Sequence, residues 1–182
     1  MSVYYAELAP REFRARLAEA PIAYLPLGTL EWHGEHLPLG ADGLQAQGFF
    51  AALAQEAGGI VLPMLFLAPD MRFELEHGVF YGMDYYGFTE TTARQLDGSA
   101  YWVPDEFFEN LLGHCLAQLA RAGFRIVVAH GHGPSTQCLY AHREAWEKTY
   151  NLKIFACWRD DESDGLGIQT DHAAANETSL IM

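Results

Sequence analysis

The chain has 182 residues, of which half are hydrophobic and 19% are charged, a composition that suits one self-contained domain over residues 1–182. Its net charge of −13, with no cluster of Lys or Arg, argues against nucleic acid and membrane surfaces as partners. The three cysteines form no CxxC pair, and no signal peptide or membrane helix is evident, so we expect a cytoplasmic protein.

The first third of the chain alternates helix and strand patterns. Apolar residues recur at helical spacing before and after a short apolar run at 22–27. Pro10 is placed to open the first helix. Gly28 closes the apolar run, which is typical of a buried strand. We therefore expect helices at 5–20 and 44–57, strands at 22–27 and 60–67, and a polar segment without periodicity at 29–42.

The rest of the chain begins with a stretch, 70–101, that is rich in Gly and aromatic residues and has no clean period. It predicts a long irregular excursion of the kind that often carries function. The clearest amphipathic pattern follows, and then a β-branched run leads directly into the string HGHGP at 130–134. We expect helices at 104–123 and 135–150 and strands at 124–129 and 153–158.

Alternation of strands with helices implies parallel pairing of the strands, and therefore a layered α/β domain. In such sheets, ligand sites form outside the carboxyl ends of the strands. Two of the three histidine-rich segments of this chain follow a predicted strand at that end. A candidate site is therefore expected there.

The first histidine-rich segment, 31–42, holds three carboxylates and two imidazoles. Glu31 and His33 are two residues apart, so in an extended segment both side chains point the same way and can share one site. Oxygen and nitrogen donors in this mixture suit zinc, manganese or iron. A solvated acidic loop is the alternative explanation for the Glu31–His33 pair taken alone.

Two later segments add candidate groups. Glycines flank His132 and leave its imidazole uncovered, as a ligand or an acid–base group requires, although a polar turn without a ligand would have the same sequence. Near the C-terminus, His172 and Glu177 could serve as a proton shuttle and a ligand, or could begin a helix that has no chemistry.

Together the three segments resemble the motifs of the creatininase family, in the same order and over nearly the whole chain. The matching strings are GTLEWHGEHLPLGAD (28–42), HGHGPS (130–135) and HAAANETS (172–179). The resemblance implies a three-layer α/β/α sandwich with a mostly parallel central sheet. It also implies two divalent metal ions per chain, either Zn, Mn or Fe.

The resemblance also assigns roles to individual residues. Asp42 would bridge the two ions, His172 would move protons to the leaving nitrogen, and Glu177 would be the second catalytic group. His36 would orient a carboxylate that binds metal. The implied metal ligands are Glu31, His33, Asp42, His132 and Glu177.

Departures from the family pattern indicate a divergent and short member that is not a true creatininase. Pro134 stands where true creatininases carry a ligand glutamate. The segment 76–83 lacks the final Pro and Thr of the family's E-H-x-x-F-P-G-T. Because that segment borders the substrate in relatives, we expect a changed specificity. The chain also ends soon after the third motif.

The resemblance therefore implies a metal-dependent amidohydrolase that cleaves a C–N bond of a small cyclic or linear amide by a metal-bound hydroxide. Two alternatives stay open. One is a metal-binding relative that no longer hydrolyses amides and has an assembly or regulatory role, and the other is a peptidase acting on a modified peptide. The implied partners are a small-molecule amide and further copies of the chain, because relatives form homo-oligomers, hexamers among them.

Overall fold

The computed structural model describes residues 2–76, 78–84, 99–157, 172 and 175–181. Its central sheet consists of β1 (Ile22–Leu27), β2 (Ile60–Val61), β5 (Ile126–Gly131) and β6 (Lys153–Ala156). These strands are all parallel and lie in the order β2-β1-β5-β6. The helices are η1 (Tyr5–Glu7), α1 (Pro10–Glu19), α2 (Ala41–Glu56), η2 (Gly82–Asp84), α3 (Asp105–Ala122), α4 (Gly133–Tyr150) and α5 (Ala175–Ile181).

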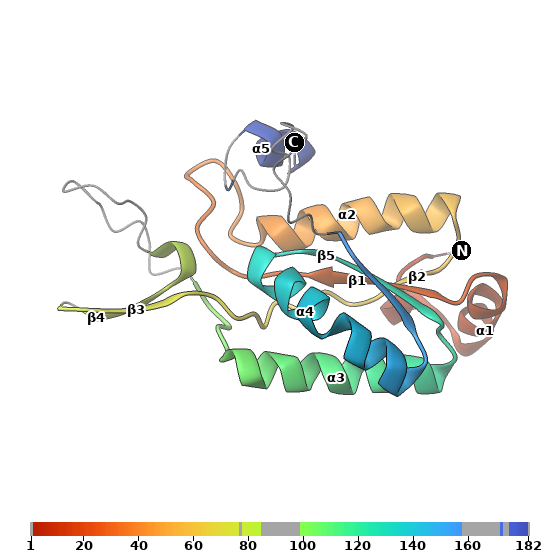
Figure 1. Cartoon of the computed structure of the whole chain (residues 1–182). Coiled ribbons are helices and arrows are strands. Elements are labelled where there is room, and N and C mark those ends of the chain that lie inside the picture. Colours follow the sequence, from red (N-terminus) through yellow and green to blue (C-terminus); the bar gives the residue numbers. More distant parts are fainter. Residues whose placement is uncertain (1, 77, 85–98, 158–171, 173–174, 182) are drawn as a thin grey trace, which may run out of the picture.

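The layers are arranged as the sequence predicts. One face of the sheet is covered by α2 and the other by α3 and α4, which confirms the three-layer α/β/α sandwich with a parallel central sheet (Figure 1). None of the described helices is both long and apolar enough to cross a membrane. All three cysteines are free thiols.

Strand β1 lies at the centre because both of its faces are apolar. Leu25 and Leu27 point into the main core, which the sheet shares with α3 and α4. Tyr24 points the opposite way, into a smaller core where its ring packs against Phe50 of α2. Successive side chains of a strand alternate between faces, so a strand covered on both sides has an unbroken apolar sequence.

The apolar stripe predicted for 104–123 becomes the buried face of α3. Phe108, Leu112 and Leu116 recur at four-residue spacing and are fully buried in the main core. Burial of each side chain contributes about 2 kcal/mol of transfer free energy. The stripe therefore fixes which side of α3 faces the sheet.

The order of the strands places a topological switch point between β1 and β5. From β1 the chain passes through α2 to β2, on one side of the sheet, whereas from β5 it passes through α4 to β6, on the other side. The two connections thus diverge at the carboxyl ends of β1 and β5. This is the position where parallel α/β sheets bind their ligands.

Several elements differ from the sequence-based expectation, among them the helix expected at 5–20, which is divided into η1 and α1. The predicted strand 60–67 pairs continuously only over Ile60–Val61, because Pro63 has no N–H to extend the ladder. The segment 70–101, expected to be irregular, contains the antiparallel hairpin of β3 (Arg72–Leu75) and β4 (Gly78–Tyr81), which projects from the body (Figure 1). Residues 85–98 of that segment lie outside the described residues. Helix α2 starts three residues earlier than expected, so Asp42 lies in its first turn.

Candidate metal centre

The candidate ligands meet at the carboxyl ends of β1 and β5. The loop after β1 carries Glu31 and His33, and the first turn of α2 carries Asp42. His132 follows directly after β5, and Glu177 comes from α5. A carboxylate in the first turn of a helix is favoured because the amino end of the helix carries a partial positive charge.

Gly131 allows the end of β5 to come close to β1. Its φ angle is +134°, and a Cβ atom at this position would overlap the carbonyl oxygen of Leu27. The next residue, His132, donates its backbone N–H to the same oxygen at 3.0 Å. A glycine is therefore required here, and the His132 side chain that follows it faces Glu31 and Asp42.

Glu31, Asp42 and His132 form one triad. His132 Nδ1 lies 3.0 Å from Asp42 Oδ2 and 3.3 Å from Glu31 Oε1. One donor atom from each of the three residues lies within 4.8 Å of the others. This spacing leaves room for a cation between the three donors.

His33, Asp42 and Glu177 form a second triad of the same size. His33 Nε2 lies 3.4 Å from Asp42 Oδ1 and 3.5 Å from Glu177 Oε1. Asp42 thus belongs to both triads and turns a different oxygen toward each imidazole. The five residues that the sequence singled out as ligands are therefore all brought together.

The site is buried and rich in carboxylates. Glu31 is 3% exposed, His33 0% and His132 4%. Within the part of the chain that the structure describes, no Lys or Arg forms an ion pair with Glu31 or Asp42. Buried carboxylates need compensating positive charge, which here comes from the imidazoles.

The pKa values show how strongly the site attracts positive charge. Burial alone would raise the pKa of Asp42, but hydrogen bonds from His132 and His33 hold the pKa below its usual range. Burial would lower the pKa of His33, yet the hydrogen bond and charge of Asp42, with the neighbouring carboxylates, raise this pKa to about 9. The pKa of His132 is likewise raised well above its usual value. Burial raises the pKa of Glu31. The carboxylates of the site therefore favour positive charge at both imidazoles.

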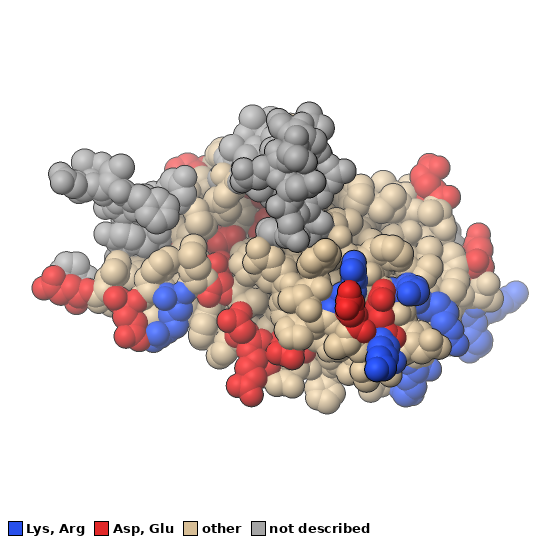
Figure 2. Space-filling model, in the orientation of Figure 1, with Lys and Arg blue, Asp and Glu red and all other residues tan. Residues whose placement is uncertain are grey.

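The charged side chains on the surface are unevenly distributed, and their distribution also favours cations near the site. On the face drawn in Figure 2, most Lys and Arg side chains gather toward the α1 end of the molecule. Asp and Glu predominate at the opposite end, where β1 and β5 finish. A field of this sign raises the local concentration of cations near the site.

The donor set fits divalent cations of the first transition series. It combines carboxylate oxygens with imidazole nitrogens, which suits zinc, manganese and iron. The two triads together supply five side chains, and the shared carboxylate gives an oxygen to each triad. The residues present therefore fit metal ions.

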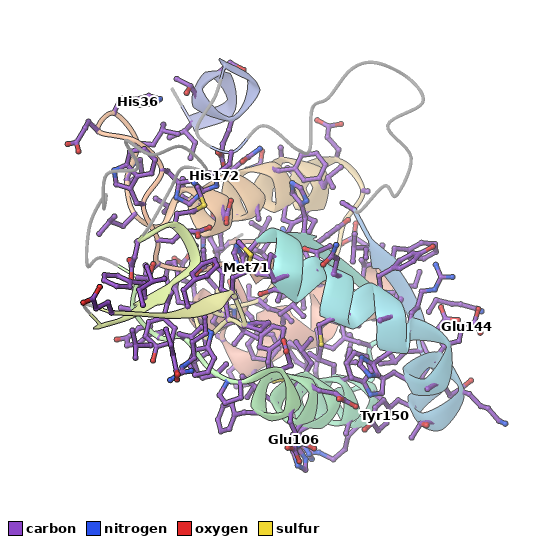
Figure 3. All side chains as sticks on the ribbon, turned by 60° about the vertical axis from the view of Figure 1, so that its left-hand side comes forward. His36, Met71, Glu106, Glu144, Tyr150 and His172 are labelled. Carbon is purple, nitrogen blue, oxygen red and sulfur yellow. The ribbon has the colours of Figure 1, made fainter. Side chains whose placement is uncertain are left out.

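His172 lies beside the loop that joins β1 to α2 (Figure 3). Its Nε2–H donates to the carbonyl oxygen of Trp32 at 2.7 Å, and its ring centroid is 4.3 Å from that of His33. One of its nitrogens lies within 4.8 Å of donor atoms of Glu31 and His33. His172 thus forms, with Glu31 and His33, a third group of possible metal ligands beside the two triads.

His36 stands at the exposed tip of the same loop (Figure 3). The sequence led us to expect that it orients a ligand carboxylate. Its Nε2 instead pairs with Thr178 Oγ1 at 2.9 Å, next to Glu177 on α5. This contact joins the loop to α5 beside Glu177.

Asp70 is the residue of this site that the sequence did not reveal. Its Oδ2 lies 3.4 Å from His132 Nε2, the ring nitrogen that does not face Asp42, and its carboxylate also shares a hydrogen bond with that of Glu31. No motif surrounds Asp70, because it stands alone in an aperiodic segment. Only the tertiary fold brings it to His132.

These features define a layered α/β protein whose candidate metal centre lies at the switch point of a parallel sheet. The family model "Creatininase: Creatinine amidohydrolase" matches residues 6–182. The chain therefore belongs to the creatinine amidohydrolase family, whose members are hydrolases that act on C–N bonds.

Individual proteins agree with this classification. Creatinine amidohydrolase of Pseudomonas putida is 27% identical over 201 residues, which cover 100% of this chain and 71% of that protein. A crystal structure of creatininase has a TM-score of 0.72 at 21% identity and covers 98% of this chain and 70% of that one. A manganese form (TM-score 0.68) and a Zn–Zn form (0.67) are each 22% identical and cover 98% of this chain and 71% of theirs. The solved structures thus share the α/β fold described above.

Proposed function

We propose that the chain is a metal-dependent amidohydrolase that hydrolyses a C–N bond of a small cyclic or linear amide. One observation carries the proposal, namely that Asp42 belongs to two triads and turns one oxygen toward each. A carboxylate shared in this way is typical of sites that hold a pair of cations. The proposed ligands of the two ions are Glu31, Asp42 and His132 for one and His33, Asp42 and Glu177 for the other.

Divalent cations bound at such a site lower the pKa of water and polarise a substrate carbonyl. The chain's own part is to present its imidazoles in the correct orientation. His33 Nδ1–H donates to the backbone oxygen of Glu31 at 3.1 Å, which leaves Nε2 for coordination. His132 Nε2–H donates to the backbone oxygen of Pro69 at 3.2 Å, which leaves Nδ1. Each ring therefore faces its triad with the nitrogen that can bind metal.

We assign His172 to proton transfer. The hydrogen bond to Trp32 fixes its ring beside His33 and leaves Nδ1 to carry the mobile proton. Amide cleavage needs a proton on the leaving nitrogen, because an amine anion is a poor leaving group. Glu177 is the proposed ligand through which α5 joins the catalytic centre.

The proposal is tested by turnover of metal-loaded protein. The protein is stripped with a chelator, reloaded with Mn²⁺ or Zn²⁺, and offered creatinine, other lactams, formamides and short peptides. Cation-dependent hydrolysis of a lactam or linear amide would support the proposal. Metal binding without turnover of any amide would favour a binding role, and cleavage of peptides alone would favour a peptidase.

Substitutions in the loop sharpen the test. Asp42→Asn removes the shared anionic donor, so both ions and all turnover should be lost while the fold persists, as judged by elemental analysis and circular dichroism. Glu35→Gln removes an exposed carboxylate from the same loop and should keep both ions and activity. Normal metal content and turnover in Asp42→Asn would refute the bridging role.

A further inference from the structure

Asp70 is held rigidly by contacts on two sides. Its Oδ1 accepts the backbone N–H of Met71 at 2.7 Å. Its backbone oxygen accepts the indole N–H of Trp102 at 3.0 Å. The side chain is only 11% exposed. These contacts engage Oδ1 and the backbone, while Oδ2 faces His132, and the Asp70 carboxylate also shares a hydrogen bond with that of Glu31.

The imidazole of His132 lies between two sets of carboxylates. Nδ1 faces Asp42 and Glu31 at 3.0 and 3.3 Å. Nε2, on the opposite side of the ring, faces Asp70 Oδ2 at 3.4 Å and the backbone oxygen of Pro69 at 3.2 Å. The proposed metal-binding nitrogen and the nitrogen that faces Asp70 are therefore different atoms of one ring.

Gly82 makes this arrangement possible. Its φ angle is +51°, and a Cβ atom here would press on Asp70 Oδ2 and would lie 2.9 Å from Glu31 Oε2. Its backbone N–H donates to the carbonyl oxygen of Met71 at 2.8 Å, which holds η2 against the Asp70 segment. Only a residue without a side chain therefore fits beside the carboxylates of Asp70 and Glu31.

We propose that Asp70 is the positioning residue of His132: its carboxylate holds the proton on Nε2 and so turns the lone pair of Nδ1 toward the first triad. This inference rests on the metal site of the proposed function. A carboxylate behind a metal-binding imidazole fixes the tautomer and the angle of the ring and makes the coordinating nitrogen more basic.

The geometry separates this role from direct metal binding. Asp70 faces Nε2, whereas the cation of the first triad would be bound through Nδ1. The Pro69 oxygen alone can accept the Nε2 proton, but it carries no net charge. Asp70 adds the negative charge, and charge-assisted hydrogen bonds are roughly twice as strong as neutral ones.

The test compares Asp70→Asn and Asp70→Ala with wild-type protein and with Glu74→Gln. Glu74 lies in the neighbouring strand β3, is exposed and pairs with Arg72, so its substitution removes a carboxylate that does not face the site. Each protein is stripped of metal, and Zn²⁺ is titrated back in competition with a chromophoric chelator. Circular dichroism establishes that the variants are folded.

Asp70→Ala should weaken Zn²⁺ binding about tenfold to a hundredfold. Asp70→Asn should lose less, because its amide oxygen still accepts the Nε2 proton. Glu74→Gln should bind as wild type does. As a second readout, ¹⁵N NMR of histidine-labelled, Zn-loaded protein should show the Nε2 resonance of His132 shifted in Asp70→Ala, shifted less in Asp70→Asn and unchanged in Glu74→Gln.

The possible failures are distinguishable. Wild-type protein that binds no Zn²⁺ would overturn the proposed function itself. If wild type binds Zn²⁺ and Asp70→Ala has the same affinity and the same His132 resonance, only the role of Asp70 is overturned. Loss of a whole ion from Asp70→Asn, with the His132 Nε2 resonance unchanged, would make Asp70 a direct ligand and would also refute the positioning role.

Discussion

Raising the pH should tighten metal binding until about pH 9, because His33 must lose a proton before it can bind a cation. In the metal-free protein, burial opposes that proton, but the hydrogen bond and charge of Asp42 and the other carboxylates raise the pKa of His33 to about 9. Protons and metal ions therefore compete for Nε2. The same competition applies to His132, whose pKa is also raised.

The size of the effect follows from the pKa of His33. At pH 7.5 a group with a pKa of about 9 is protonated in roughly 97% of molecules. Competition from this proton weakens binding at the second triad about thirtyfold, or about 2 kcal/mol, relative to binding above pH 9. Because the protonated ring is the state that cannot bind, affinity should rise about tenfold per pH unit between roughly pH 7 and 9 and then level off.

Isothermal titration calorimetry measures both the Zn²⁺ affinity and the number of protons released on binding. Zn²⁺ is titrated into chelator-stripped protein at several pH values, in buffers with different heats of ionisation, which counts the protons released. His142→Gln is the matched control, because His142 is a partly exposed histidine of α4 and should not change the count. An affinity that stays flat between pH 7 and 9, or binding without proton release, would refute the reasoning.

Three further outcomes are expected. His172→Ala should keep its metal while kcat falls about a hundredfold to ten-thousandfold, less for substrates with good leaving groups; metal loss in elemental analysis would instead make His172 a ligand. Gly82→Ala should lower both Tm and Zn²⁺ affinity, since its Cβ would press on Asp70 and Glu31; an unchanged melting curve and affinity would contradict this close approach. Burial and the carboxylates of α3 raise the pKa of Cys138 to about 11. Its alkylation by iodoacetamide at pH 8, followed by mass spectrometry, should be about a hundredfold slower than that of an ordinary thiol, and rapid labelling would disprove the shift.

The parallel sheet and the main ligands could be predicted because their signals are local. β1 is an unbroken apolar run, and the ligands Glu31 and His33 follow it within a few residues. His132 stands directly after another such run. Since the carboxyl ends of parallel strands meet at one edge of a sheet, adjacency in sequence was enough to predict adjacency in space.

The remaining features depend on contacts that no local pattern encodes. The β3–β4 hairpin is largely exposed on both faces, so its residues show no alternation of apolar and polar side chains. Asp70 contacts His132 only because the segment after β2 passes beside the end of β5. The early start of α2 at Ala41 was missed because its first turn follows Pro38 and Gly40 in a string that looked wholly like a loop.

The docking of α5 against α2 has a consequence for the stability of the whole chain (Figure 1). His36 and Thr178, which are 142 residues apart in sequence, touch across this junction, and Glu177 contributes to the second triad there. An ion held by both His33 and Glu177 would act as a cross-link that closes almost the entire chain into one ring. Such a link limits the freedom of the unfolded chain, as a disulfide does. Metal loading should therefore protect α5 from proteolysis, and the protease sensitivity of α5 should indicate whether the metal site is occupied.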